Sequence, residues 1–409
     1  MRLLTIFLSI ALLGNAGAAT FGLYTYTVNA DNASVTITDY PTDATGAIEI
    51  PATIDGRSVT SIAGSAFRDC SSLTSITIPD SVTSIRNFAF RSCSSLTSIT
   101  IPNSVISIQG EAFHNCRSLT SFVVAVDNPN YSSMGSLLLN KNGTVLVAAP
   151  TASGDFTIPD SVTSIGFRAL SGTGLTSITI PDSVTSIEIW AFAECSSLTS
   201  VIIGNSVTSI GPHAFFGCSS LTSVTIPDRV TSIGHRAFYN CKSLTSITIP
   251  DSVTSIGDQA FGAEAQYSLA NSYAMGQGVA QDNVEAVQWY RKAAEQGHVE
   301  AQLILGRMYF NGDGVPEDAV ETVKWVRKAA EQGYAKAQIV LANMYDIGHG
   351  APKDYVEAYM WLNLAAAQGN EGAKKGKGIL SERMTREQIA EAQKLSREWL
   401  AKRLSDDNT

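Results

Sequence analysis

The sequence predicts an α and β repeat protein, in which a solenoid of 23-residue strand-plus-turn units is followed by an α-helical solenoid of 36-residue units. Two regular spacings predict this fold. Phenylalanines that follow an alanine recur in two runs, Phe67, Phe90 and Phe113, then Phe192, Phe215, Phe238 and Phe261. Tryptophans recur in the last third of the chain at Trp289, Trp325 and Trp361. Fixed periods of this kind are typical of solenoids, in which each unit buries its apolar side only against its neighbours.

Residues 1–19 are predicted to be a signal peptide. Arg2 supplies a positive start, Leu3 to Leu13 form an apolar run, and Ala16-Gly17-Ala18 is a small-residue cleavage site. The apolar run is shorter than the roughly 20 residues that a bilayer span needs. Since no later stretch is apolar enough to span, we expect an exported protein with no transmembrane segment after signal removal.

The net charge and the placement of the cysteines argue against a nucleic-acid partner, disulfides and a zinc site. The net charge of −9 argues against a nucleic-acid partner, because such binding needs Lys and Arg to neutralise phosphate. The six cysteines occupy the same place in successive repeats. Equivalent side chains of stacked strands lie about 4.8 Å apart, beyond the ~3.8 Å that a disulfide prefers between Cβ atoms. We therefore favour a column of buried free thiols over disulfides, and a linear column does not suit tetrahedral zinc.

The first solenoid begins with a cap. Residues 20–59 contain two alternating segments, Tyr24 to Val28 and Ser34 to Ile37, which predict a hairpin that covers the open end. Residues 60–262 hold the 23-residue units. In the first unit the apolar side chains of one strand are expected to face inward, and Ser75 and Thr77 to face outward.

Residues 121–156 interrupt the 23-residue period. The corner Lys141-Asn142-Gly143 lies between two apolar runs and predicts a hairpin insert. The next turn has Leu170 in place of Phe and Ser171-Gly-Thr-Gly174 in place of the cysteine segment, one residue short. We expect a local irregularity at that turn and no break in the stack there.

The helical repeats are predicted over residues 263–371, with a first helix that covers the open end of the preceding solenoid. Each unit has an Ala-rich helix, a Gly-x-Gly turn, a second helix and a glycine suited to the left-handed residue after a helix end. Residues 372–409 are predicted to be a capping helix and tail. The apolar face of this helix comprises Ile389, Ala392, Leu395, Trp399 and Leu400.

The repeats resemble two known families. The segment SSLTSITIPDSVTSI, the Ala-Phe-x-x-Cys element and the variant Asp127-Asn-Pro-Asn-Tyr131 resemble BspA-like leucine-rich repeats of the Treponema pallidum type, over residues 60–262. Residues 263–371 resemble Sel-one-like repeats through Gly312-Asp-Gly-Val-Pro316 and Trp289-Tyr-Arg-Lys-Ala-Ala-Glu-Gln-Gly297. The third unit departs from this pattern, with Asn363-Leu364 where Arg or Lys is usual. The resemblance implies binding scaffolds, with surface attachment for the first and adaptor roles for the second, and it carries over no catalytic motif.

Two variable columns flank the repeated Ala-Phe pair, and they are the candidate protein-binding face. The residue before Ala and the residue after Phe change between repeats, and they mix Arg, His and aromatic side chains, which protein interfaces prefer. The candidate residues are Phe88, Arg91, His114, Arg168, Trp190, His213, Phe216, Arg236 and Tyr239. The alternative is that the residue types on convex turns vary between repeats without any functional constraint. Trp190 and Arg236 are expected to be exposed.

Other polar patterns favour a structural explanation. Outward residues such as Ser75 and Thr77 form an array that can order water, a sugar or ice, yet Thr also simply favours strands. No histidine pair has metal-binding spacing and no nucleophile–base pairing is found, so we expect no catalytic residue, metal or cofactor. We hypothesise a non-enzymatic, secreted or cell-surface bacterial scaffold that binds other proteins, such as extracellular or envelope components. The alternative is a periplasmic adaptor that works through its helical repeats.

Overall fold

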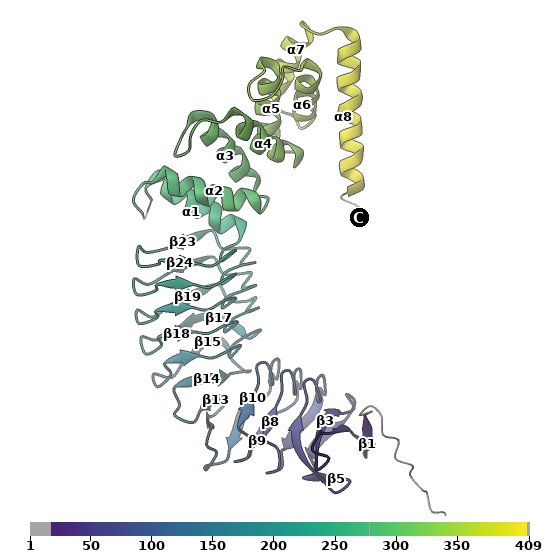
Figure 1. The fold of residues 1–409 in the computed structure, drawn as a ribbon, viewed down its shortest axis with the longest axis vertical. Helices are drawn as coiled ribbons and strands as arrows, with labels where there is room; N and C mark the ends of the chain where they lie inside the picture. The colour runs from purple at the N-terminus through teal and green to yellow at the C-terminus, as the bar shows by residue number, and fades with distance from the viewer. Residues whose placement is uncertain (1–17, 278, 407–409) are drawn as a thin grey trace, which may run out of the picture. The chain divides into compact units, whose positions relative to one another are not determined.

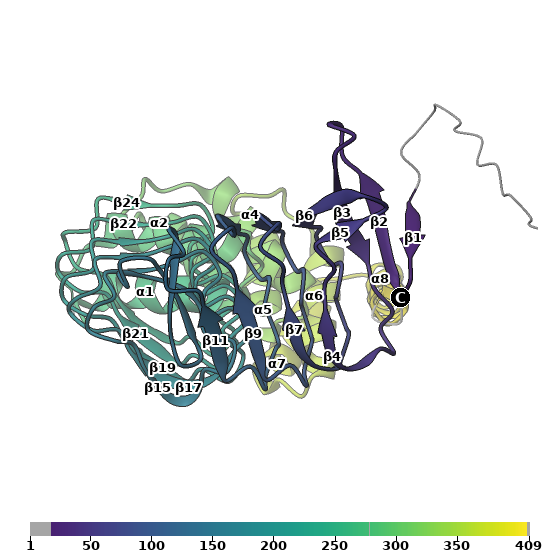
Figure 2. The same ribbon diagram turned by 90° about the horizontal axis from the view of Figure 1, so that it is seen from below.

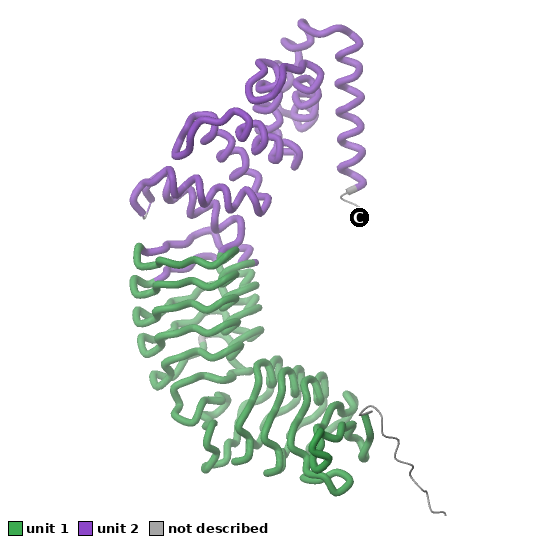
Figure 3. The backbone as a smooth tube through the Cα atoms, viewed as in Figure 1, with its two compact units in different colours: residues 1–221, 227–239, 251–260 green, residues 222–226, 240–250, 261–409 purple. Residues whose placement is uncertain are grey.

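The computed structural model describes residues 18–277 and 279–406, which form two compact units (Figure 3). The first unit contains the chain up to residue 221, with 227–239 and 251–260. The second contains 222–226, 240–250 and 261–409. Residues 1–17 of the expected signal peptide lie outside the described residues.

The first unit begins with a stack of strands that we call the first stack. Its strands are β1 (Ala19–Phe21), β2 (Tyr24–Val28), β3 (Ser34–Asp39), β4 (Thr45–Glu49), β5 (Thr53–Ile54), β6 (Arg57–Ile62), β7 (Ser72–Thr77), β8 (Ser84–Ile85), β9 (Ser98–Ile101), β10 (Ser107–Ile108) and β11 (Ser121–Val124). One sheet has the order β1-β2-β3-β6-β8-β10, with β5 paired to β6, and the other has the order β4-β7-β9-β11. Figure 2 shows the strands of the second sheet, β4, β7, β9 and β11, side by side.

Equivalent residues of successive repeats pair in register. Ser75 lies opposite Ser98 in the long strands, and Ile85 lies opposite Ile108 in the short ones, in parallel ladders. The short strand is an element that the repeat pattern does not predict. At the N-terminal end β2 and β3 pair antiparallel, at the residues where a hairpin is expected, and β3 then pairs in parallel with β6.

A second stack completes the first unit (Figure 1). Its strands are β12 (Tyr131–Met134), β13 (Leu137–Asn140), β14 (Val145–Ala148), β15 (Ser153–Thr157), β16 (Ser164–Ile165), β17 (Gly174–Thr179), β18 (Ser186–Ile187), β19 (Ser200–Ile202), β20 (Ser209–Ile210), β22 (Ser232–Ile233) and β24 (Ser255–Ile256). One sheet runs β12-β13-β14-β16-β18-β20-β22-β24, and β15, β17 and β19 follow one another in a second sheet.

The insert separates the two stacks. The strands β12, β13 and β14 form an antiparallel meander that starts a new sheet, and β11 ends the old one. The buried Asn128 amide donates to the carbonyls of Pro102 and Val105, which anchors the insert to the first stack. At the turn that contains Leu170 the stack continues, with a register shift at Gly154. The irregularity is confirmed there, and the sheets break earlier, at the insert.

Each 23-residue repeat also contains a turn segment, and these segments form a third side of the solenoid beside its two sheets. Backbone bonds join these segments from one repeat to the next, as from Phe90 N to the Ala112 carbonyl (2.8 Å). The Phe rings stack inside, with centroids 4.9 Å apart for Phe192 and Phe215. The six cysteines are buried thiols, which confirms the predicted column. The Cys93 thiol, for example, donates to the Phe67 carbonyl at 3.1 Å.

The second unit combines two strands with the helical repeats. The strands are β21 (Ser223–Thr225) and β23 (Ser246–Thr248), which pair in parallel. The helices are α1 (Ala263–Met275), α2 (Asn283–Glu295), α3 (Val299–Asn311), α4 (Ala319–Glu331), α5 (Ala335–Ile347), α6 (Tyr355–Ala367), α7 (Glu371–Ser381) and α8 (Arg386–Asp406). The predicted cover is found, since α1 packs against β23. Gly276, Gly312 and Gly348 end the first helix of each pair in the left-handed conformation.

The last helix packs on the third repeat. Ala392 and Ser396 of α8 are buried, and the α8–α6 contact includes the Trp361–Trp399 ring pair. Leu400 departs from the expected apolar face and is 42% exposed. The reason is length: α8 has 21 residues and α6 has 13, so the end of α8 extends past its neighbour.

Candidate functional site

The side chains that flank the buried Ala-Phe pairs lie in a row outside the turns, which we call the outer ladder. It contains eight of the nine predicted residues and one acidic residue. Its members are Phe88, Arg91, Glu111, Arg168, Trp190, His213, Phe216, Arg236 and Tyr239.

In one of its two columns, the residues before each alanine, the outer ladder has a backbone conformation that large side chains avoid. The residue before each Ala-Phe pair has positive φ, as at Phe88 (62°), Trp190 (61°) and His213 (57°). Only glycine, asparagine and aspartate adopt this region readily, and other residues pay about 1 kcal/mol or more. The turn geometry thus favours Gly or Asn at these positions, yet the chain places aromatic and charged residues there.

In the second stack the ladder side chains contact one another continuously. The Arg168 guanidinium lies over the Trp190 ring (4.7 Å), and Trp190 stacks on His213 (4.0 Å). Phe216 meets the edge of Trp190 at 5.2 Å and stacks with Tyr239 at 6.0 Å. Burial lowers the pKa of His213, with the nearby His235 as the next cause, so the stack holds a neutral imidazole at pH 7.

An ion-pair cluster joins the part of the outer ladder in the first stack to the part in the second stack. Glu111 forms ion pairs with Arg91 (3.5 Å) and with Arg168, although its side chain is only 4% exposed. Arg91 also lies over the Phe88 ring at 5.3 Å. A nearly buried carboxylate is tolerated only when it is paired. Glu111 therefore holds both guanidinium groups in place.

Trp190 and Arg236 are half-buried, and the expectation that they are exposed is wrong. Trp190 is sandwiched between Arg168 and His213. Arg236 lies over the Tyr239 ring at 5.3 Å and donates to the Gln259 side chain at 2.7 Å. Packing between equivalent positions of adjacent repeats covers these side chains, and residue type alone does not predict it.

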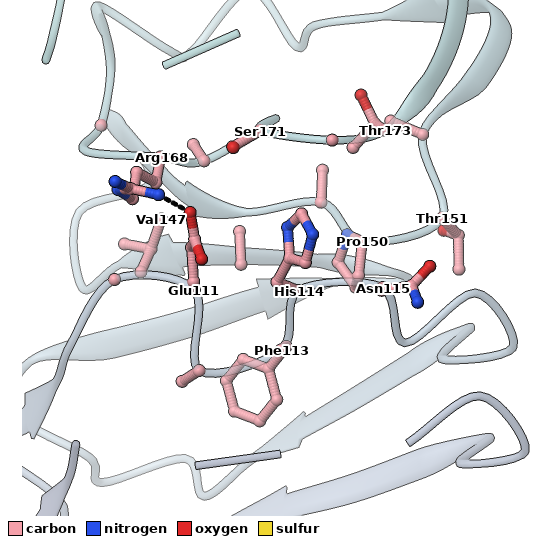
Figure 4. A pocket seen from close by; sticks show the side chains of 18 of the residues that line it. Glu111, Phe113, His114, Asn115, Val147, Pro150, Thr151, Arg168, Ser171 and Thr173 are labelled. Carbon is pink, nitrogen blue, oxygen red and sulfur yellow. Dashed lines mark ion pairs between the residues drawn. The ribbon is translucent and has the colours of Figure 1, made fainter. Parts of the chain in front are cut away.

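The remaining predicted residue, His114, lies in a pocket of about 530 Å³ between the two stacks (Figure 4). In Figure 4 one turn supplies Glu111, His114 and Asn115, and a turn beyond the insert supplies Arg168, Ser171 and Thr173. Further wall residues are Phe113, Arg117, Val147, Pro150, Thr151, Ser153, Phe167, Ser196 and Ser197.

His114 is packed tightly against the opposite turn. A Cβ atom at Gly172 would lie 2.2 Å from the His114 ring, and Gly172 has a φ of +64°, so both space and backbone require glycine there. Burial, followed by the charge of Arg91, lowers the pKa of His114, which a hydrogen bond to the Ser171 backbone partly opposes. Its Nδ1 atom is buried without a hydrogen-bond partner among the described residues.

Sequence reasoning missed Glu111, Phe167 and Ser171 as pocket residues. Glu111 is the one acidic residue in the column before Ala-Phe, which is a signal that was present in the sequence. Ser171 lies in the segment that departs from the cysteine pattern. Nothing in the repeat pattern indicates that turns on opposite sides of the insert meet.

A second cavity, of about 370 Å³, lies in the helical repeats of the second unit. It is lined mainly by apolar side chains of α3, α4 and α5, and its polar members are Arg307, Thr322, Asn343 and His349. Phe310 and Ile347 on its wall are 51% and 68% exposed. This groove is a candidate contact surface for an apolar segment.

In residues 18–277 and 279–406, no three His, Cys, Asp or Glu side chains come together as a metal site would require. None of the helices in those ranges combines the length and the apolar character of a bilayer span.

Comparisons with known families match both solenoids. The BspA type Leucine rich repeat region matches in six copies, over residues 47–140 and 151–267, which is slightly more than half of the chain. The Sel1 repeat matches residues 263–298, 299–334 and 335–370. Both are repeat-scaffold families that mediate protein–protein interaction. No curated protein matches the chain.

Three solved structures are similar to parts of the chain. A Sel1 repeat protein from Oxalobacter formigenes is 42% identical, covers 29% of this chain and 48% of its own, and has a TM-score of 0.28. A leucine rich cell surface protein from Faecalibacterium prausnitzii is 23% identical, with coverages of 57% and 95% and a TM-score of 0.31. The T. pallidum leucine-rich repeat protein is 26% identical, with coverages of 60% and 88% and a TM-score of 0.27.

These TM-scores are too low to support an argument about function, and the chain spans about half the length of the Oxalobacter protein. Family membership rests on the repeats themselves. The register of the parallel strands, the buried Phe and Cys columns and the paired helices agree with the two family matches. The chain belongs to the BspA-type leucine-rich repeat family, and its leucine-rich repeats are followed by three Sel1 repeats.

Proposed function

We propose that this protein is a non-enzymatic, exported scaffold that binds another protein through the outer ladder, at the cell surface or after secretion. The observation that carries the proposal is the occupancy of positive-φ positions by Phe, Arg, Trp and His, where Gly or Asn would cost less backbone energy. A large side chain at a position where the backbone disfavours it supports a role for the side chain itself.

The chemistry of the ladder supports a protein partner. Trp, Tyr and Arg dominate the contacts that carry binding energy at protein interfaces, and they do so when they are held rigid and partly covered. The contacts of Trp190 with Arg168 and His213 hold these side chains before a partner arrives, so little conformational entropy is lost on binding.

The test compares three full-length variants in a pull-down from envelope and medium fractions, with each captured partner then measured by surface plasmon resonance. Trp190→Ala and Trp190→Gly should weaken partner binding at least tenfold, which corresponds to about 1.4 kcal/mol or more. Glycine relieves the positive φ, so Trp190→Gly should change the free energy of unfolding by less than about 1 kcal/mol. The control Thr179→Ala, on an exposed strand position, should bind like the wild type.

Unchanged partner binding in both Trp190 variants would remove the outer ladder as the binding face. Export is tested separately, by fractionation of cells that express the full chain. Recovery in the medium, or protease sensitivity in intact cells, supports a secreted or surface location. Recovery only after outer-membrane permeabilisation supports a periplasmic location.

The apolar groove of the helical repeats favours a second candidate function, a periplasmic adaptor. The exposed side chains of Phe310 and Ile347 offer an apolar surface that the second unit itself leaves uncovered. Phe310→Ser and Ile347→Ser should abolish partner binding if this groove is the working surface, whereas Trp190→Ala should then leave partner binding unchanged.

A further inference from the structure

The pocket between the two stacks has the size of a small-molecule site. Its volume of about 530 Å³ lies within the range of roughly 300–1,000 Å³ that is usual for ligand pockets. Turns from both sides of the insert form its walls, as Figure 4 shows for Glu111 below and Ser171 above. The site is distinct from the protein-binding face, because only its Glu111–Arg168 end belongs to the outer ladder.

The charged lining of the pocket is cationic in a chain whose net charge is −9. The lining contains two guanidinium groups, those of Arg117 and Arg168, and a single carboxylate, Glu111, which is already paired with Arg91 and Arg168. No lining carboxylate of the described residues is thus left for an ammonium group, which argues against an amine ligand. The excess guanidinium donors suit one carboxylate of a ligand.

The uncharged wall suits a ligand with several hydroxyl groups. The hydroxyls of Thr151, Ser153, Ser196 and Ser197 can each donate and accept a hydrogen bond. A wall of hydroxyl groups that both donate and accept hydrogen bonds suits a polyol better than an apolar molecule. A phosphate-rich ligand would instead need a larger excess of cations than one guanidinium group.

An aromatic ring at the Arg168 end provides an apolar platform. One edge of the Phe167 ring packs against Gly110, where an added Cβ would lie 2.2 Å from Cε1, and the side chain is 48% exposed. The Arg168 guanidinium lies 5.5 Å from the ring centroid. The C–H face of a sugar ring can pack on such a ring while its polar groups contact the hydroxyl wall.

We propose that this pocket binds a sugar acid, a saccharide unit with one carboxylate, which contacts the guanidinium group of Arg168, while Arg117 at the Asn115 end of the pocket donates to a ring hydroxyl. The ring hydroxyls contact the Ser and Thr wall, and the C–H face packs on Phe167. This site does not depend on the proposed protein-binding function.

Isothermal titration calorimetry of the full chain with glucuronate, glucose and acetate tests the proposal. Glucuronate should bind at least tenfold more tightly than either glucose or acetate, since each of these lacks one half of the contacts. Arg168→Gln should lower the affinity for glucuronate at least tenfold. Arg236→Gln is the matched control, because Arg236 occupies the same repeat position outside the pocket, and it should leave glucuronate binding unchanged.

Arg168 also pairs with Glu111, so a second variant guards against misfolding. Arg117 is exposed and donates to Asn115 within its own turn (2.7 Å), so Arg117→Gln should keep the wild-type melting temperature and lose affinity for glucuronate several-fold. Absence of glucuronate binding, equal affinity for glucose or acetate, or wild-type affinity in both pocket variants overturns the proposal.

The source of the sugar acid is distinguished by a second arm with a glucuronate-containing tetrasaccharide. Binding of the tetrasaccharide at least as tight as that of free glucuronate identifies a glycan as the source. Binding of the monosaccharide alone identifies a free sugar acid. A loss of partner protein binding in Arg236→Gln, with glucuronate binding intact, would show that the two sites fail independently.

Discussion

The inner Phe column and the outer ladder occupy adjacent positions in the turns. They differ in burial, in the regularity of their side-chain contacts and in backbone energy. Phe215 is fully buried and stacks at 4.9 and 5.0 Å on the equivalent rings before and after it. Its chain neighbour Phe216 is half-buried and contacts three different side chains, Trp190, His213 and Tyr239. Identical rings stack regularly inside, and varied side chains interlock outside.

The stabilising inner column and the proposed binding face are thus one residue apart along the chain. The inner column gains free energy from burial, which any large apolar side chain of the right shape supplies. The outer ladder includes positions with positive φ, where the backbone energy is unfavourable for its residues. Three stability measurements test this separation.

The largest effect is expected for the adjacent pair Phe215 and Phe216. Phe215→Ala should lower the free energy of unfolding by about 3–5 kcal/mol, because it leaves a cavity in a packed column. Phe216→Ala should lower it by no more than about 1 kcal/mol, because that side chain keeps solvent contact. Urea unfolding followed by circular dichroism measures both. Equal losses would mean that the outer ladder is part of the core.

A smaller effect is expected for the thiol column. Cys218→Ala removes a buried sulfur that donates to the Phe192 carbonyl at 3.1 Å, and it should cost about 1–2 kcal/mol of unfolding free energy. The neighbouring half-buried Ser219→Ala should change stability by less than about 0.5 kcal/mol. A cost at Ser219 that matches the cost at Cys218 would contradict the division between inside and outside.

The smallest effect is a pH dependence from His114. Burial lowers its folded-state pKa below the unfolded value of about 6.5, so the unfolded chain binds more protons in the window beneath pH 6.5. The stability is therefore complete above pH 6.5 and falls as the pH drops through the folded-state pKa. Wild type should lose more unfolding free energy between pH 7.5 and pH 5 than His114→Gln does.

His213→Gln provides the comparison for that measurement, since burial also lowers the pKa of His213 in the outer ladder. Each variant should remove part of the acid sensitivity. If neither variant alters the pH dependence, the histidines titrate as they would in water, and the packing around Gly172 and Trp190 is looser than the structure has it.

Periodicity alone was enough to predict the two solenoids, the inward Phe and Cys columns, the glycine caps and the residues of the variable columns. Burial in a solenoid depends on the alternation of apolar and polar residues within one repeat and on the stacking of equal repeats. Both are local properties that can be read from the sequence of a single repeat. For the same reason the pattern indicated which residues share one side of the turns.

The contacts of the site followed only from the folded chain. The pairing of Glu111 with Arg168 and the packing of His114 on Gly172 join turns on opposite sides of the insert, where the repeat is interrupted. The half-burial of Trp190 likewise depends on which side chain each neighbouring repeat carries. Periodicity carries no information about contacts across a break in the period, so the pocket emerges only when the two stacks are placed in space.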